Sequence, residues 1–402
     1  MTILSSAGMN LRKFSSNSTE FLESIPENNR DSLSPDGTIK TLGLKWKPVD
    51  ETIGFVTRPV RFDNVTRRII LSEISSNFDP DGLLGPVTFS FKKFLKVVFS
   101  LQLPWDSQIP EKEANEWKKI ASTFQEIDQI RIPRHAVIED FHDVQLHGFC
   151  DASDAGYGAC VYVRSSNAEG RTICQLLCAK SRIAPKEYQS TARFELCGVV
   201  ILVHLMLQVS NAISLPFSKK VCWSDSGIAL QWLKKCPLQL QTFVANRVSE
   251  IQELSKDFIW RHIRGEVNPA DYISRRLTPA KIRNCDLWWH GPAFLIMPEN
   301  SWPESIVNID PNEPLFTQEF KRVESWTLTA STTEAQAVEI LTNPFLNWIE
   351  NSSRTFLVKW KMSPIVRFVH NLRAQKLKVP RRTGNIQVED LLEAELAIAR
   401  IC

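Results

Sequence analysis

The sequence predicts an α/β fold, in which a mixed sheet is flanked by helices. Three apolar runs separated by turn residues lie between Val144 and Ala179 and predict neighbouring strands. Thr191–Gln208 follows without a proline and carries apolar residues at steps of three and four, which predicts a helix with one apolar face against the sheet. A further strand at 220–223 and helices at 228–235 and 239–254 continue the α/β order.

Four carboxylates in this region stand in distinctive local sequences. They are Asp151 in HGFCDASDAG, Glu195 in TARFELCGVV, Asp225 in VCWSDSGIALQWL and Asp271 in HIRGEVNPADYISR. Carboxylates at strand ends and helix starts of an α/β fold can converge from different elements. Their hard oxygen donors suit two divalent ions, which can activate a water and stabilise the leaving oxygen in phosphodiester hydrolysis.

The order of these motifs resembles the ribonuclease H domain of long-terminal-repeat retrotransposons, and RFELCG, SDSGIALQWL and NPADYISR are similar to the BEL/Pao group. The resemblance implies a ribonuclease H-like mixed sheet and endonucleolytic cleavage of RNA in RNA–DNA hybrids. It implies that Mg²⁺ or Mn²⁺ is held by Asp151, Glu195, Asp225 and Asp271. It also implies that His262 assists product release or proton transfer, although His262 ends an apparent strand at 258–263 rather than lying in a Gly-flanked loop.

Two other functions stay open. Asp225-Ser226-Gly227 forms the triplet of aspartic peptidases, in which two such carboxylates share a proton across a cleft. The chain also resembles the Pao retrotransposon peptidase family from about Leu42 to Leu205. A peptidase lobe expects a strand pair after its triplet, whereas a helix is predicted here, so nuclease chemistry is favoured. The third interpretation is a non-catalytic, nucleic-acid-binding remnant of a retroelement polyprotein.

Ordinary structural roles compete for single residues. Asp225 alone is equally well explained as a helix cap, a role that Ser224 or Ser226 also fits. His262 in an apolar strand is more often a packed or hydrogen-bonded histidine. The four carboxylates taken together are not explained in this way, because capping does not account for their shared order and surrounding motifs.

Basic residues beside the carboxylates are predicted to contact a phosphate backbone. They are Lys234, Lys235 and Arg247. A hybrid duplex is recognised by its shape and backbone more than by its base sequence. The partners predicted for the chain are therefore an RNA–DNA hybrid and, by the resemblance, the reverse-transcriptase and integrase regions of a parent polyprotein.

Four regions follow from the motifs. Residues 1–60 resemble the end of a reverse-transcriptase palm with a hairpin at 41–56, and 61–139 carry thumb and connection-like helices and a linker, with the phrases ILSEIS, FDPDGLLGPV and LPWD. The ribonuclease H-like region is 140–280. A Trp/Pro-rich extension and pre-integrase spacer, irregular and helical, make up 281–402. No Tyr-x-Asp-Asp element occurs, so polymerisation is not predicted.

Composition places the chain among folded proteins. Its 402 residues are 43% apolar and carry a net charge of +3, so nucleic-acid binding has to rest on local basic patches. Nine cysteines at irregular spacing are typical of reduced, buried thiols and give no zinc spacing. The sequence shows neither a signal peptide nor a membrane-spanning run, and we expect an intracellular protein, cytoplasmic or nuclear, without a membrane partner.

Overall fold

The computed structural model describes residues 4–321, apart from gaps at 5, 35, 42, 59, 61–63, 186–188, 276, 305–309 and 311–312, and scattered residues between 363 and 394. The chain forms two compact units, Met1–Arg322 and Val323–Cys402. In the second unit residues 363–371 are helical. Of the extension and spacer predicted at 281–402, most of the part after residue 321 lies outside the described residues.

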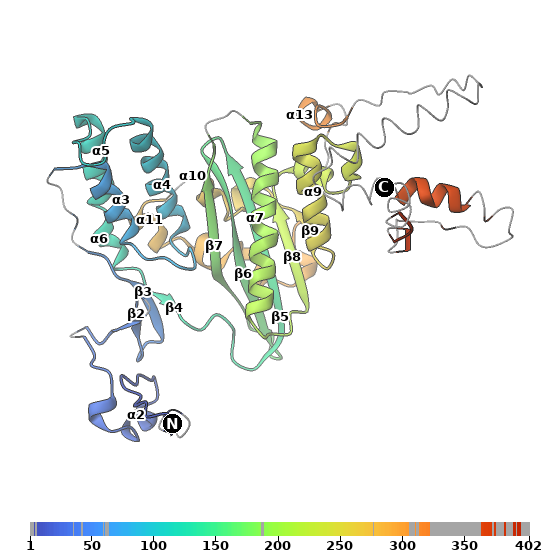
Figure 1. Cartoon of the computed structure of the whole chain (residues 1–402). Coiled ribbons are helices and arrows are strands. Elements are labelled where there is room, and N and C mark those ends of the chain that lie inside the picture. Colours follow the sequence, from blue (N-terminus) through green and yellow to red (C-terminus); the bar gives the residue numbers. More distant parts are fainter. Residues whose placement is uncertain are drawn as a thin grey trace, which may run out of the picture. The chain divides into compact units, whose positions relative to one another are not determined.

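A five-stranded mixed sheet forms the centre of the first unit (Figure 1). Its strands are β5 (Phe141–Ser153), β6 (Gly156–Asn167), β7 (Thr172–Ile183), β8 (Lys219–Ser224) and β9 (Ile259–His262). The order across the sheet is β7-β6-β5-β8-β9; the first three strands are antiparallel, and β5, β8 and β9 run parallel. The predicted mixed sheet with flanking helices is thus confirmed.

Successive side chains of β5 point alternately to the two faces of the sheet. Leu146 and Cys150 face one core, and Phe149 faces the other. The first core is covered by α7 (Thr191–Ala212), α8 (Gly227–Trp232), α9 (Thr242–Leu254) and α13 (Pro314–Thr317). Among the described helices, α7 is the one whose length and apolar composition would suffice to cross a membrane; here its apolar residues pack against the sheet.

The second face is covered by one helix that precedes the strands of the sheet in the chain and by three helices that follow them. They are α4 (Gly85–Ser100), α10 (Asp271–Arg275), α11 (Pro279–Arg283) and α12 (Asp286–His290), followed by 3₁₀ turns at Ala293–Ile296 and Glu299–Ser301. Trp288 is fully buried, its indole N–H donates to the Leu83 carbonyl at 2.9 Å, and its own carbonyl accepts from the Tyr162 hydroxyl at 2.7 Å. The Trp/Pro-rich extension therefore belongs to this core.

The N-terminal part forms a small second sheet and a helical group. The sheet contains β1 (Ile39–Thr41), β2 (Leu44–Lys47), β3 (Thr52–Phe55) and β4 (Ile132–Pro133), in that order. The predicted hairpin is the β2–β3 pair, and the predicted linker at 130–138 contributes β4. The helical elements are α2 (Thr19–Glu23), η1 (Glu27–Asn29), α3 (Arg67–Ser75), α5 (Glu111–Ala121) and α6 (Phe124–Ile127).

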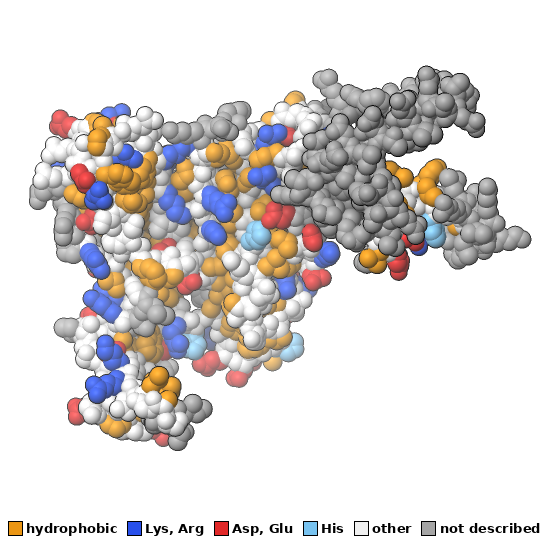
Figure 2. All heavy atoms as spheres, in the orientation of Figure 1, with side chains coloured by type: hydrophobic (Ala, Val, Ile, Leu, Met, Phe, Trp, Pro, Cys, Tyr) orange, Lys and Arg blue, Asp and Glu red, His pale blue; other side chains and the backbone are white. Residues whose placement is uncertain are grey.

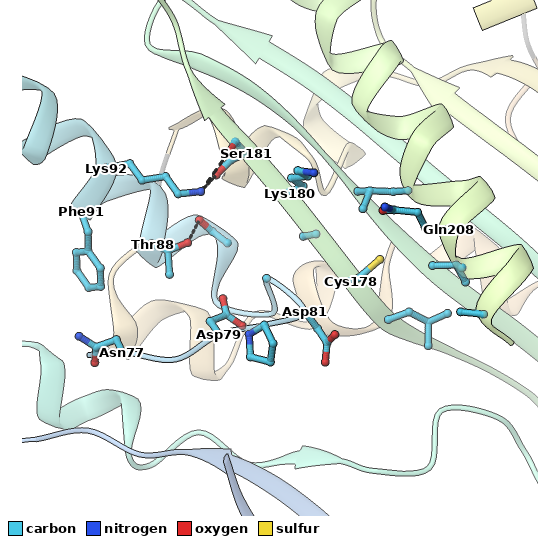
Figure 3. A pocket seen from close by; sticks show the side chains of 18 of the residues that line it. Asn77, Asp79, Asp81, Thr88, Phe91, Lys92, Cys178, Lys180, Ser181 and Gln208 are labelled. Atoms are coloured by element: carbon cyan, nitrogen blue, oxygen red, sulfur yellow. Dashed lines mark hydrogen bonds between the residues drawn. The ribbon is translucent and has the colours of Figure 1, made fainter. Parts of the chain in front are cut away.

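The outer edge of β7 is covered by α4 and by the turn that precedes α4. The Ala179 N–H donates to the Asp81 carbonyl at 2.8 Å. The Lys92 ammonium donates to the Ser181 carbonyl at 3.2 Å (Figure 3). The Lys96 ammonium donates to the Ala184 carbonyl at 2.7 Å. Lys92 thus binds the edge strand of the sheet, and Lys96 binds the residue that follows this strand.

Candidate active site

The site begins where the parallel strands β5 and β8 end. Cys150 pairs with Ser224 in the register of these strands, so the next residues, Asp151 and Asp225, come at the same edge of the sheet. Neighbouring strands lie about 4.8 Å apart, which brings two carboxylates side by side. The apolar residues that precede them, Phe149 and Trp223, stack at 6.0 Å between ring centroids and fix the two strand ends.

Glu195 reaches the same place from α7. Ser190 caps this helix by accepting from the Arg193 N–H, which places Glu195 in its first turns. Gly198 permits a close approach of α7 to β5, because a Cβ there would lie 3.2 Å from the Asp151 carbonyl. The Ser226 hydroxyl donates to Glu195 Oε2.

Ser226, and not Asp225, caps α8, because its hydroxyl accepts from the Ala229 N–H at 3.1 Å. The side chain of Asp225 is thereby left for the site. The backbone after the Asp225-Ser226-Gly227 triplet enters α8 directly, and the carboxylates whose charges act on Asp225 are Glu195 and Asp271 of its own chain.

Asp271 is supplied by the short helix α10, which packs against the end of β5. One turn on, the Ser274 hydroxyl donates to Asp151 Oδ2 at 2.5 Å. Asp271 Oδ1 accepts from Arg275 Nε at 2.6 Å, and Asn268 hydrogen-bonds the Asp225 carboxylate. Each of the four carboxylates thus has a protein partner of its own.

Burial and mutual repulsion disfavour the charged forms of these acids. Burial, followed by the charge of Asp225, raises the pKa of Asp151 to about 7, while the Ser274 hydroxyl opposes this shift. Burial and the charge of Glu195 raise the pKa of Asp225 to about 6. The pKa values of Glu195 and Asp271 are raised as well, both mainly by burial. Such a group of partly buried like charges is typical of sites that bind cations.

The donor chemistry of this group fits divalent cations. Its carboxylate oxygens are the hard ligands that Mg²⁺ and Mn²⁺ prefer, and Arg275 is the cation paired with them. A Cβ at Gly265 would lie 3.3 Å from Asp225 Oδ2, so glycine keeps the space beside this oxygen open. Within the described part of the chain, however, no three His, Cys, Asp or Glu side chains are gathered closely enough to form a ready ligand set.

His262 lies beside the site at the end of β9. Its Nε2 is 3.2 Å from the Asp225 carbonyl oxygen, and its ring is half-buried. An Nε2–H group would donate to this carbonyl and hold the turn that carries Asp225. The structure therefore places His262 next to Asp225, and its role in product release stays a prediction.

The predicted phosphate contacts lie on α9 and just beyond α8. Lys234 is exposed, Lys235 is half-buried with its ammonium 6.0 Å from the Phe316 ring, and the Arg247 guanidinium lies 3.5 Å from the Phe243 ring. In the view of Figure 2, Lys and Arg side chains gather over the upper part of β7 and α7, towards the end of the sheet where β5 and β8 end. Exposed Lys180 and Arg182 lie on this part of β7.

The sequence interpretation missed the hydrogen-bond partners of the carboxylates. They are Ser226, Asn268, Ser274 and Arg275. Helical spacing from Asp271 would have pointed to Arg275, four residues on. No sequence feature around Ser274 indicates that it hydrogen-bonds Asp151, which lies 123 positions earlier in the chain.

A second cleft of about 710 Å³ lies away from the carboxylates, between the turn at 79–82, α4, β7 and α7 (Figure 3). Two of the groups with a shifted pKa that line it, Asp79 and Lys92, have structural partners. Asp79 accepts the N–H groups of Leu83 and Leu84 at 2.8 and 2.9 Å, and burial raises its pKa to about 6. Burial lowers the pKa of Lys92, which binds the edge of β7.

Asp79 should make stability depend on pH. Its pKa is about 3.8 in the unfolded chain and about 6 in the fold, so the folded state binds more protons between these values and loses stability as the pH rises through them. We expect the free energy of unfolding of Asp79→Asn, relative to that of the wild type, to rise by about 2 kcal/mol between pH 4 and pH 7. Urea unfolding in EDTA at both pH values measures this difference; an equal offset at both would contradict it.

Comparison with known proteins gives matches to part of the chain. No curated protein matches the chain. Among solved structures, the N-terminal RNase H domain from Mycobacterium tuberculosis, fused to maltose-binding protein, is 12% identical with a TM-score of 0.23 and covers 33% of this chain and 90% of its own. LC11-RNase H1 in complex with RNA/DNA hybrid is 11% identical, with a TM-score of 0.23 and coverages of 31% and 88%.

The foamy viral protease-reverse transcriptase in complex with RNA/DNA hybrid is 14% identical with a TM-score of 0.35. The match covers 68% of this chain and 31% of the viral chain, so this chain spans about a third of the viral one. A family model described as the Pao retrotransposon-like RNaseH-like domain matches residues 66–226, which include α3, α4, the strands β5 to β8 and three of the four carboxylates. Over residues 66–226, therefore, the chain is similar to the Pao retrotransposon-like RNaseH-like domain.

Proposed function

We propose that the chain is a metal-dependent endonuclease that cleaves the RNA strand of RNA–DNA hybrids. The observation that carries the proposal is the meeting of Asp151 and Asp225 at the ends of two parallel strands, with the charges of Glu195 and Asp271 acting on them. A group of buried like charges costs folding free energy, and a bound cation would offset this cost.

Asp151, Glu195, Asp225 and Asp271 would hold the metal through their carboxylate oxygens. Divalent ions bound there would supply an activated water and charge stabilisation for the leaving oxygen. Ser226, Ser274 and Asn268 hold three of the carboxylates in place, and the stacked pair below the strand ends excludes water from under the site. His262 would assist departure of the product, beside the turn that it binds.

Backbone contacts would hold the duplex. Lys234, Lys235 and Arg247 supply positive charge on and near helices α8 and α9. Phosphate contacts from such residues set the position of a duplex without reading its sequence. Cleavage without strong sequence preference and a fall in affinity with rising salt are therefore expected. The reverse-transcriptase and integrase regions of a parent polyprotein are the proposed protein partners.

Cleavage of a labelled RNA–DNA hybrid by the purified full chain tests the proposal. We expect cuts in the RNA strand with Mg²⁺ or Mn²⁺, none with EDTA, and none in the DNA strand or in double-stranded DNA. Double-stranded RNA is a further control for the hybrid requirement. Metal-independent cleavage, or metal binding without any cleavage of the hybrid, would contradict the proposed activity.

A further inference from the structure

The Ser274 hydroxyl joins two parts of the carboxylate group that are far apart in sequence. Ser274 lies on α10, one turn after Asp271, and its side chain is buried with 2% of the residue exposed. Its Oγ donates to Asp151 Oδ2 at 2.5 Å and lies 3.1 Å from the Asp271 carbonyl oxygen. The helix that supplies the fourth carboxylate thus also holds the first.

In this hydrogen bond the Ser274 hydroxyl is the donor and the Asp151 carboxylate is the acceptor, which suits a residue that orients the carboxylate. A serine hydroxyl is neutral, so it can hold a carboxylate oxygen without cancelling the negative charge that a cation needs. Oδ2 of Asp151 is occupied by this bond, and the side chain of the strand residue is held at a fixed rotation. Arg275, in contrast, is a cation on Asp271 and competes with metal for that carboxylate.

Ser274 is itself held in place by the sheet. Its carbonyl accepts from the Ser153 hydroxyl at 3.0 Å, two residues beyond Asp151 on β5. The end of β5 and the helix α10 are therefore tied together twice, once through the Asp151 carboxylate and once through the backbone of Ser274. Only the first of these ties touches a carboxylate, which makes Ser153 a matched control.

We propose that Ser274 is a positioning residue for Asp151, which sets the orientation in which this carboxylate meets a divalent cation. The proposal rests on the metal-dependent function proposed above. Groups that hydrogen-bond metal-binding carboxylates orient them, and loss of such a group costs about 10–100-fold in metal affinity. The same hydroxyl does not face the duplex, because it is buried behind Asp151.

The test compares Ser274→Ala, Ser274→Thr and Ser153→Ala in the full chain. Titration calorimetry with Mn²⁺ should show a loss of affinity of about 10-fold or more for Ser274→Ala, recovery for Ser274→Thr, which keeps a hydroxyl, and wild-type affinity for Ser153→Ala. Cleavage by Ser274→Ala should need a correspondingly higher metal concentration, while its affinity for hybrid in EDTA stays unchanged. Thermal melting in EDTA confirms that each variant is folded.

The outcomes separate this inference from the proposed function. Wild-type protein that binds Mn²⁺ and cleaves hybrid, beside a Ser274→Ala variant with equal Mn²⁺ affinity, would overturn the positioning role alone. Equal weakening by Ser153→Ala would also overturn it, because the backbone tie would then be the cause. Wild-type protein that binds no Mn²⁺ would overturn the proposed function and this inference together.

Discussion

Asp225→Asn should abolish cleavage of an RNA–DNA hybrid without unfolding the chain. Asn is equal in size to Asp but lacks the negative charge, so the site would lose one of its four proposed metal ligands, which lies beside Asp151. We expect a fall in cleavage rate of about 10³-fold or more, equivalent to ~4 kcal/mol of transition-state stabilisation. Single-turnover cleavage with Mg²⁺ and with Mn²⁺ measures this effect.

The same variant should be at least as stable as the wild type in EDTA. Removing one of several buried like charges relieves repulsion from Glu195 and Asp271. Asp257→Asn, on the exposed turn before β9, is the control and should change neither activity nor stability. Retained metal-dependent cleavage by Asp225→Asn would exclude Asp225 as a ligand and leave the peptidase and remnant interpretations.

Trp288→Ala should destabilise the whole ribonuclease H-like unit. Trp288 is fully buried, packs near Gly85 at the start of α4, and bonds both Leu83 and Tyr162. Truncation of a buried Trp leaves a cavity, and here it also leaves the Leu83 carbonyl without this donor. We expect the free energy of unfolding to fall by about 3–5 kcal/mol in urea titrations.

Ile296→Ala is the matched control, because Ile296 lies in the same extension but is 50% exposed. It should cost less than about 1 kcal/mol. A similarly small cost for Trp288→Ala would show that the extension is an appendage and that the sheet folds without it. A large cost would show that the ribonuclease H-like core continues past residue 280, the end predicted from the motifs.

Much of the fold follows from local patterns. The apolar runs before Asp151 and Asp225 and the periodicity of Thr191–Gln208 are strong enough to predict β5, β8 and α7, and the motif order predicts that their carboxylates meet. The predicted strand at 144–150 is shorter than β5, because the hairpin continues pairing out to Phe141 and Ser153. The strand propensity of the residues around 144–150 does not predict the additional length of β5.

Other features depend on contacts between distant segments. β4 is a strand because Ile132 pairs with Ile53, and no pattern around Pro133 indicates this. Lys92 and Lys96 lie on one helix face, yet Lys92 binds a carbonyl of β7 and Lys96 binds the Ala184 carbonyl just after β7. In each case the local structure depends on a contact between residues that are far apart in the chain. Such a contact cannot be identified from the residues around each position in one sequence.

The covered edge of β7 has a consequence for how this domain can be separated from its neighbours. An edge strand with free peptide groups is a template for pairing with another chain. Here Asp81 and Lys92, both from the segment before residue 140, occupy peptide groups on that edge, and Lys96 binds the Ala184 carbonyl just beyond it. A fragment that starts at 140 would lose this protection and should self-associate through β7, so the smallest well-behaved ribonuclease H-like piece of this chain has to begin near Thr66.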